Sequence, residues 1–344
     1  MVNNMVNSEL SFLKDIVKEI GGEYTQLASE IDETETYVDT GSYIFNALVS
    51  GSIFGGVSGN KITAIAGETS TGKTFFSLAV VKNFLDNNPT GYCLYFDTEA
   101  AITKSLLECR GIDTTRLVVV NVVTIEDFRN KTLKAVDMYL KKSKDERKPC
   151  IFVLDSLGML STNKEITDTL AEKDTRDMTK AQLIKGAFRM LTLKLGQANI
   201  PMIVTNHTYE SMSLYGGKQM SGGSGLQYAS STIVYLSKSK EKDGTEVVGN
   251  IIHAKTQKSR LSKENKVVEI RLFYDERGLD KYYGLLELGQ LGGLWKNVAG
   301  RYEIDGKKLY AKEILKDAEK YFTAEVMQKL NEIAQAEFSY GSTN

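Results

Sequence analysis

The chain has 344 residues, a formal net charge of −1, 42% hydrophobic residues and only 3 prolines. This composition excludes a disordered chain and a protein that is basic throughout, although it allows a local basic channel for nucleic acid. We find neither a signal peptide nor an apolar run of membrane length, and therefore expect a cytoplasmic protein with no membrane partner. Cys93, Cys109 and Cys150 lie in or beside apolar runs without paired spacing, which predicts reduced core thiols.

Residues 1–40 are predicted to form a small N-terminal helical arm. They hold nine acidic residues against Lys14 and Lys18, which leaves the rest of the chain mildly basic. Before a stop signal at Gly21 and Gly22, apolar residues recur at helical spacing. These are Leu10, Leu13, Ile16, Val17 and Ile20. The segment 12–20 either packs on its own domain or docks on another subunit as an oligomerisation arm.

Residues 41–282 alternate between strands and helices, which predicts an α/β core. A mainly parallel central sheet, covered on both faces, is expected from five apolar strands: 61–66, 92–97, 116–122, 150–155 and 201–206. Three further strands leave no room for helices and are expected as antiparallel additions: 231–236, 246–258 and 267–273. Residues 283–344 are predicted to be a small helical C-terminal region, with Trp295 as a core anchor.

Residues 67–74 fit the phosphate-binding loop (P-loop) pattern, in which two glycines flank four residues and lysine and a hydroxyl residue follow. An apolar strand precedes the segment and a helical pattern follows it, which is the required context. Lysine would reach the β- and γ-phosphates, and the last threonine would hold Mg²⁺. The residues expected to contact the nucleotide are Gly67, Glu68, Thr69, Ser70, Thr71, Gly72, Lys73 and Thr74.

Polar residues end three of the predicted strands, at the edge where ligands bind in an α/β sheet. Asp155 is expected to hold Mg²⁺ together with Thr74. Glu99 is a candidate for orienting the water that attacks the γ-phosphate, with Asp97 as its rival and a helix cap as the other interpretation. His207 either senses the γ-phosphate or has a structural role.

These features resemble RecA-type recombinases, and specifically the UvsX branch of T-even-like phages. Segment 206–210 is especially specific, because bacterial relatives carry glutamine where His207 stands. The resemblance covers nearly the whole chain through the P-loop and the stretches 48–51, 96–99, 154–158, 200–201, 205–210, 258–260 and 283–286.

The resemblance implies a RecA-like P-loop ATPase core that uses ATP and Mg²⁺. Glu99 matches the catalytic glutamate, and His207 matches the γ-phosphate sensor at the start of the second DNA-binding loop. Lys258 and Arg260 match two cations that reach across a filament interface to the ATP of the neighbouring subunit, although a solvated strand edge is the alternative. Leu106 stands where relatives have a tyrosine beside the adenine, so an apolar contact would replace stacking.

Two long polar segments at strand ends are predicted DNA-binding loops, about 159–174 and 208–225. The second contains apolar groups able to stack on bases and glycines that let the backbone approach phosphates. Arg189 matches a family arginine that contacts the DNA backbone, with a plain surface cation as the alternative. The predicted DNA-binding residues are Arg176, Lys185, Arg189, Tyr209, Met212, Tyr215, Lys218 and Met220.

The implied function is ATP-dependent homologous recombination, in which helical filaments on single-stranded DNA pair with homologous double-stranded DNA and exchange strands. Such a protein would serve recombination, repair and recombination-dependent replication in the host cell cytoplasm. Its expected partners are a phage mediator protein, a single-stranded DNA-binding protein and a helicase. A ring-forming, helicase-like motor ATPase on the same core is the alternative. A regulatory ATP-binding protein is disfavoured by the intact Glu99.

Overall fold

The computed structural model describes residues 12–21, 25, 27–30, 36–172, 178–210, 218–243, 245–273, 275–304 and 306–341. These residues divide into two compact units, one up to Thr36 and the other from Tyr37 onward. The domain limits expected at residues 40 and 282 stay predictions.

The first unit contains a helix at residues 12–20 and a 3-10 helix, η1 (Ala28–Glu30). The longer helix stops where the glycines indicate, because Gly21 adopts a left-handed φ of 65° and its N–H donates to the Val17 carbonyl at 3.2 Å. Phe12, Leu13 and Ile20 are exposed. Leu10 and Gly22 lie outside the described residues.

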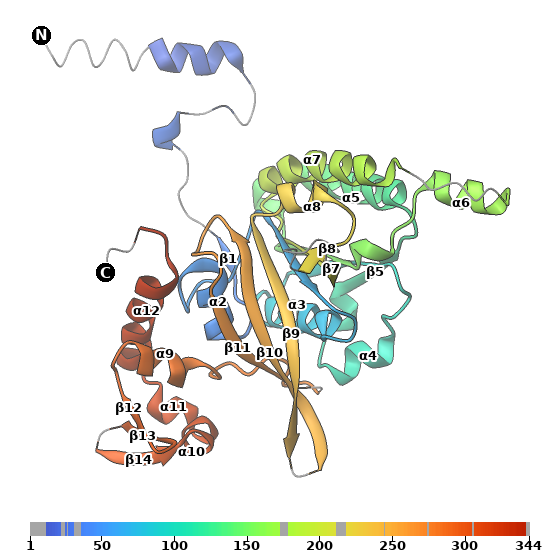
Figure 1. The fold of residues 1–344 in the computed structure, drawn as a ribbon. Helices are drawn as coiled ribbons and strands as arrows, with labels where there is room; N and C mark the ends of the chain where they lie inside the picture. The colour runs from blue at the N-terminus through green and yellow to red at the C-terminus, as the bar shows by residue number, and fades with distance from the viewer. Residues whose placement is uncertain are drawn as a thin grey trace, which may run out of the picture. The chain divides into compact units, whose positions relative to one another are not determined.

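A nine-stranded sheet forms the centre of the second unit (Figure 1). The strand order is β11-β10-β9-β3-β7-β6-β4-β5, with β8 paired to β7. The five strands expected between residues 61 and 206 are all present and pair in parallel. The strands are β3 (Ile62–Gly67), β4 (Tyr92–Asp97), β5 (Leu117–Asn121), β6 (Cys150–Asp155), β7 (Met202–Glu210), β8 (Lys218–Met220), β9 (Thr232–Asp243), β10 (Glu246–Ser259) and β11 (Val267–Phe273).

The direction expected for the strand at 231–236 is wrong. This strand, β9, pairs with β3 in parallel, from Thr63 opposite Thr232 to Gly67 opposite Leu236. Parallel neighbours need a crossover connection, and the chain between β7 and β9 provides one through the short helix α8 (Ser224–Ala229). Of the three strands expected to be antiparallel, β10 and β11 are so, as expected. The short strand β8 also pairs antiparallel, with β7.

Helices cover both faces of this sheet, as the unbroken apolar strands predict. In β6, Ile151 and Val153 face one core cluster, whereas Phe152 and Leu154 face the other. The first cluster contains α2 (Tyr43–Ser50), α3 (Lys73–Asn87), α4 (Lys104–Cys109), α9 (Leu285–Leu291) and α12 (Ala324–Phe338). The second contains α5 (Ile125–Leu140), α7 (Lys180–Ala198) and α8. Figure 1 shows α5, α7 and α8 grouped together.

The remaining elements lie at the margins of the sheet. A two-stranded antiparallel pair precedes the P-loop strand and consists of β1 (Tyr37–Val38) and β2 (Val57–Ser58). The 3-10 helix η4 (Leu157–Met159) leads into the first predicted DNA-binding loop, and within that loop the chain forms α6 (Asn163–Leu170). The hydroxyl of Thr162 caps α6 by accepting from the N–H of Glu165.

The C-terminal region is helical as expected, but it also contains an unexpected three-stranded antiparallel sheet. Glycines at left-handed φ, Gly300 and Gly306, make the two turns of this sheet. Trp295 is buried and its Nε1 donates to the Leu286 carbonyl at 2.7 Å, which confirms it as a core anchor. The elements are β12 (Lys296–Val298), β13 (Arg301–Ile304), β14 (Lys307–Tyr310), α10 (Ala311–Lys316) and α11 (Ala318–Tyr321).

Two of the three cysteines are core thiols, as expected. Cys93 and Cys150 are buried, and burial raises the pKa of Cys150 to about 12. Cys109 is exposed, so the prediction is wrong for this residue. Among the described residues, no helix combines the length and the apolar character that crossing a membrane requires.

Candidate nucleotide-binding site

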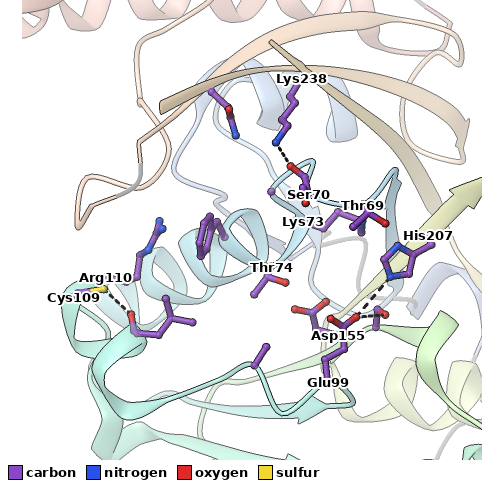
Figure 2. A pocket seen from close by; sticks show the side chains of 16 residues that line it. Thr69, Ser70, Lys73, Thr74, Glu99, Cys109, Arg110, Asp155, His207 and Lys238 are labelled. Carbon is purple, nitrogen blue, oxygen red and sulfur yellow. Dashed lines mark hydrogen bonds and ion pairs between the residues drawn. The ribbon is translucent and has the colours of Figure 1, made fainter. Parts of the chain in front are cut away.

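The P-loop connects β3 to α3, as its sequence pattern requires (Figure 2). Gly67 ends β3, and a Cβ on this residue would lie 2.8 Å from both the Leu236 carbonyl oxygen and the Thr71 hydroxyl. Gly72 caps α3 in a left-handed conformation with φ 92°. The loop therefore needs glycine at both positions, and the N-terminus of α3 points its backbone N–H groups at the space above the loop.

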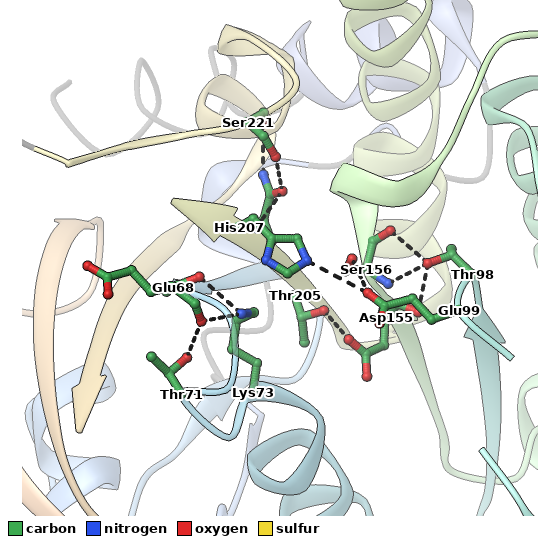
Figure 3. A network of polar contacts seen from close by, with 12 residues as sticks. Glu68, Thr71, Lys73, Thr98, Glu99, Asp155, Ser156, Thr205, His207 and Ser221 are labelled. Carbon is green, nitrogen blue, oxygen red and sulfur yellow. Dashed lines mark hydrogen bonds and ion pairs between the residues drawn. The ribbon is translucent and has the colours of Figure 1, made fainter. Parts of the chain in front are cut away.

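The side chain of Lys73 is held in place by backbone carbonyls of the P-loop. Its Nζ donates to the carbonyls of Gly67 at 3.0 Å and Glu68 at 2.9 Å (Figure 3). The residue is only 7% exposed. Burial lowers the pKa of Lys73, while the nearby carboxylates of Asp155 and Glu99 act in the opposite direction.

A cavity of about 870 Å³ opens over the P-loop. At one end it is lined by Leu106, Cys109 and Arg110, and at the other by Glu99 and His207. This volume suits a nucleoside triphosphate, with its base at the first end and its γ-phosphate at the second. Of the predicted P-loop contacts, the cavity lining includes Thr69, Ser70, Gly72, Lys73 and Thr74.

Three predicted P-loop residues have other roles in the loop. The Thr71 hydroxyl donates to the Glu68 carbonyl at 2.9 Å and so closes the turn. Gly67 allows the close approach of β9. The Glu68 carboxylate forms an ion pair with Lys218 at 2.6 Å.

Thr74 and Asp155 fit a magnesium ion, because both line the cavity and both offer oxygen donors. The two oxygens of Asp155 accept hydrogen bonds from Tyr95 Oη at 2.7 Å and from the Thr205 hydroxyl. Burial and Asp155 raise the pKa of Tyr95 well above its ordinary value, so Tyr95 stays a donor. Where the structure describes the chain, no three His, Cys, Asp or Glu residues form a metal cage. An ion here would take its other ligands from phosphate oxygens and water.

Glu99 lies at the same end of the cavity as His207. One oxygen of its carboxylate accepts from the Ser156 hydroxyl at 3.1 Å and lies 3.7 Å from His207 Nε2. Its rival Asp97 is buried and accepts instead from the backbone N–H groups of Glu99 and Ile102. Asp97 thus shapes the turn that presents Glu99, and only Glu99 of the two lines the cavity.

His207 connects this end of the cavity to the second predicted DNA-binding loop. Its carbonyl accepts from the N–H of Ser221 at 3.0 Å, so the two ends of that loop meet at His207. Asn206 reinforces the junction, because its side chain bonds both the hydroxyl and the carbonyl of Ser221 at 2.6 and 2.9 Å. Gly158 packs against the ring of His207, since a Cβ there would lie 3.2 Å from its Cδ2.

Sequence reasoning missed seven residues that line the cavity: Phe75, Ala101, Cys109, Arg110, Ser156, Lys238 and Asn250. Lys238 on β9 donates its Nζ to the Ser70 carbonyl (Figure 2). Asn250, on the neighbouring strand β10, also lines the cavity. The Arg110 guanidinium lies 3.9 Å from the centre of the Phe75 ring. Their sequence signals are weak, because the two strand residues become neighbours of the P-loop only through the parallel pairing of β9 with β3.

The structure does not bring Lys258 and Arg260 to this cavity. Lys258 Nζ instead donates to the carbonyls that end α8, those of Gln227 at 2.7 Å and Ser230 at 2.8 Å. Burial, and secondly the charge of Arg260, lower the pKa of Lys258. Arg260 is exposed next to it at the end of β10.

The predicted DNA-binding residues fall into three groups. Lys185 and Arg189 are exposed on α7, and Tyr209 and Lys218 are exposed at the base of the second loop. Met220 is only 8% exposed and belongs to the core cluster under α7, so its side chain does not lie on the surface. Arg176, Met212 and Tyr215 lie outside the described residues.

The regions of this chain that match known proteins include all the residues of this site. A family model described as the RecA N-terminal domain matches residues 8–280. The chain is 33% identical over 276 residues to the "Recombination and repair protein" of Enterobacteria phage T4, covering 80% of this chain and 69% of that protein. It is 26% identical over 301 residues to "Protein RecA" of Arthrobacter sp. (strain FB24), covering 86% of this chain and 81% of the relative. "Protein RecA" of Bifidobacterium longum (strain NCC 2705) is 25% identical over 301 residues, with coverages of 86% and 72%.

Proposed function

Because the chain belongs to the RecA family, we propose that it is an ATP-dependent recombinase that forms helical filaments on single-stranded DNA and exchanges strands with a homologous duplex. One observation carries this proposal beyond family membership. His207 lies 3.7 Å from Glu99 in the nucleotide cavity, and its strand continues directly into the second predicted DNA-binding loop. His207 therefore borders both the nucleotide cavity and the segment expected to bind DNA.

In the proposed hydrolysis step, Glu99 orients a water molecule and accepts its proton as the water oxygen attacks the γ-phosphorus and ADP leaves. Ser156 supports this role, because its hydroxyl holds the Glu99 carboxylate at 3.1 Å. Lys73 and the N–H groups at the start of α3 stabilise the phosphate oxygens. Thr74 and Asp155 would hold Mg²⁺, which when bound neutralises charge on the phosphates.

His207 would act as the switch between the two sites. In the ATP state its ring would contact the γ-phosphate and so hold the ends of the second loop, which its backbone joins to Ser221. Loss of the γ-phosphate would remove that contact and loosen the loop, an order–disorder transition of the kind that nucleotide switches use. DNA would then be released.

Self-association would complete the catalytic site. Lys258 and Arg260 do not line the cavity of their own chain, which supports a role at the ATP of a neighbouring subunit. Two exposed apolar surfaces support such an assembly: the helix at 12–20 and the edge strand β5, where Val118 is 53% exposed. An open helical arrangement follows when one such surface binds a different surface on the next copy.

DNA would bind along α7 and the second loop. Lys185, Arg189 and Lys218 supply positive charge for backbone phosphates, and Tyr209 supplies a ring for base stacking. Arg176, Met212 and Tyr215 stay part of this proposal on the resemblance alone. A mediator, a single-stranded DNA-binding protein and a helicase stay the proposed partners in the host cytoplasm.

The experiment that tests this function measures ATP hydrolysis with and without single-stranded DNA, while electron microscopy images the assemblies. We expect strong stimulation by DNA and long helical filaments, both in the presence of ATP and Mg²⁺. Glu99→Gln should assemble on DNA without hydrolysis, because it binds nucleotide but lacks the base. Closed rings would instead indicate the motor ATPase, and hydrolysis indifferent to DNA would contradict both.

A further inference from the structure

The turn that follows Lys258 and Arg260 is held in place by the C-terminal end of α12. We propose that residues 336–340 position these two cations for catalysis at the ATP of the adjoining subunit. This inference rests on the proposed function, in which Lys258 and Arg260 act across the subunit interface. It assigns the C-terminal region a part in hydrolysis, through residues that touch no substrate.

Lys258 lies near the end of β10, and Arg260 directly follows the strand. The pairing of β10 with β9 shifts register between Thr256 and Lys258, a β-bulge of the kind that re-aims side chains next to sites. Ser259 lies between the two cations. Its side chain is 6% exposed and points to the opposite side of β10 from that of Lys258. Any shift of the Ser259 backbone therefore moves both cations together.

Three hydrogen bonds and one ion pair join this turn to the end of α12. The N–H of Lys263 donates to the Phe338 carbonyl at 2.6 Å, and its Nζ donates to the Ala336 carbonyl at 2.8 Å. Tyr340 Oη donates to the Ser259 carbonyl at 3.3 Å. Lys266 forms an ion pair with Glu337. These contacts are spread along the turn, from Ser259 at its start to Lys266 at its end.

The same turn is fixed from a second side. The buried hydroxyl of Ser262 donates to the Leu48 carbonyl at 2.6 Å, at the end of α2. Helix α12 is in turn anchored to the segment after α2, because the side-chain oxygen of Asn331 accepts from Ser52 Oγ at 2.7 Å and from the N–H of Ile53 at 3.0 Å. The turn thus lies between two elements that are tied to each other.

This support matters because catalysis by charge across an interface depends steeply on position. A misplacement of about 1 Å can lower a rate by about a hundredfold. Lys258 already has alternative partners in its own chain, the carbonyls of Gln227 and Ser230. A firmly held backbone therefore decides where its flexible side chain can reach.

The test uses the double variant Lys263→Met, Tyr340→Phe, which removes two side-chain contacts between α12 and the turn. We expect kcat of DNA-stimulated ATP hydrolysis to fall about three- to tenfold, with KM for ATP and the melting temperature unchanged. The matched control is Lys329→Met, Tyr310→Phe. It makes the same two changes in the C-terminal region, at residues that contact Glu325 and Arg301 instead of the turn. This control should keep the wild-type rate.

Mixing subunits separates a positioning role from general damage. Glu99→Gln subunits cannot hydrolyse ATP but carry an intact turn. In filaments mixed with the double variant, they would supply well-placed cations to its intact P-loops. The mixture should therefore hydrolyse ATP faster than the mean of the two separate preparations. Lys258→Ala, Arg260→Ala mixed in the same way serves as the reference.

The outcomes distinguish the inference from the function on which it rests. If the reference variant loses activity and is rescued by mixing, but the C-terminal double variant keeps wild-type kcat, the positioning role is overturned and the proposed function stands. If the reference variant keeps its activity or is not rescued, catalysis across the interface itself fails. A C-terminal variant that loses activity without rescue also contradicts the positioning role.

Discussion

Lys218 forms an ion pair with Glu68 at 2.6 Å and so joins β8, within the second predicted DNA-binding loop, to the P-loop. The hydrogen bond and the charge of Lys218 lower the pKa of Glu68. Register brings Lys218 opposite Glu210 at the base of the loop. If a DNA phosphate bound Lys218 in place of the Glu68 carboxylate, Glu68 in the P-loop would lose its ion-pair partner.

The first prediction follows from this competition. Glu68→Gln should free Lys218 and strengthen binding of single-stranded DNA at low salt, whereas Lys218→Met should weaken it and flatten its salt dependence. The double variant should bind DNA like Lys218→Met alone, because the two residues act through one contact. Fluorescence anisotropy with labelled oligonucleotides measures these affinities. Glu325→Gln on α12 is the control, since it breaks a similar ion pair with Lys329 elsewhere. Equal DNA affinity of Glu68→Gln and the wild type would contradict the competition.

Lys73 leads to a prediction on pH. Because burial lowers its pKa, Lys73 loses its proton at a lower pH than an ordinary lysine. A bound phosphate favours the charged form, so nucleotide binding should take up protons in alkaline buffer and weaken as the pH rises through the Lys73 pKa. Calorimetry in buffers of different ionisation enthalpy measures this uptake. Lys73→Arg, which stays charged, should show none from this position. Uptake that persists in the arginine variant would assign it to another group.

Histidine substitution tests the switch. His207→Ala should lower DNA-stimulated ATP hydrolysis about tenfold, the size expected for one lost contact to a charged transition state, and leave the basal rate closer to the wild type. His207→Gln should retain part of the stimulation because it keeps a polar side chain. The control is His253→Gln at the other histidine, which lies on β10 beside Glu269. Full stimulation in His207→Ala would remove His207 from the mechanism.

Two glycines allow a stability test of the support under the second loop. A Cβ at Gly225 in α8 would lie 2.8 Å from the Lys185 backbone in α7, so Gly225→Ala should force the helices apart and cost about 1–3 kcal/mol. At Gly186 in α7 the same Cβ would meet nothing within 4 Å, so Gly186→Ala should gain about 0.5–1 kcal/mol through helix propensity. Urea unfolding measures both free energies. A neutral Gly225→Ala would show that the packing of α7 against α8 is loose.

The P-loop and the strand-end carboxylates could be predicted from sequence because their chemistry is local. A strand, a glycine-bounded loop and a helix define Lys73 and Thr74 within a few residues, and parallel strands bring Asp155 and Glu99 to the same edge. Lys238 could not be predicted, because it reaches Ser70 only through the pairing of β9 with β3.

The direction of a strand and the burial of a side chain were harder to predict than the positions of the strands along the sequence. The parallel pairing of β9 depends on a crossover through α8. The sequence does not predict this helix, because the stretch that forms it is rich in glycine. Met220 looked like an exposed wedge in a polar loop, yet it ends β8 and packs in the core beneath α7. The short C-terminal strand β13 alternates charged and apolar residues between turns at Gly300 and Gly306, a hairpin signal that a helical interpretation of the region overlooks.

Because only one of the three cysteines is exposed, a thiol-reactive dye can be attached to this protein at a single site. Cys93 and Cys150 are buried and burial raises their pKa, which protects them from thiol reagents in the folded protein. Cys109 is exposed at the end of the cavity where the base would lie. A maleimide dye should therefore label this single position, and bound nucleotide should slow the labelling. Filament growth and nucleotide turnover could then be followed by fluorescence on the natural sequence, without engineered cysteines.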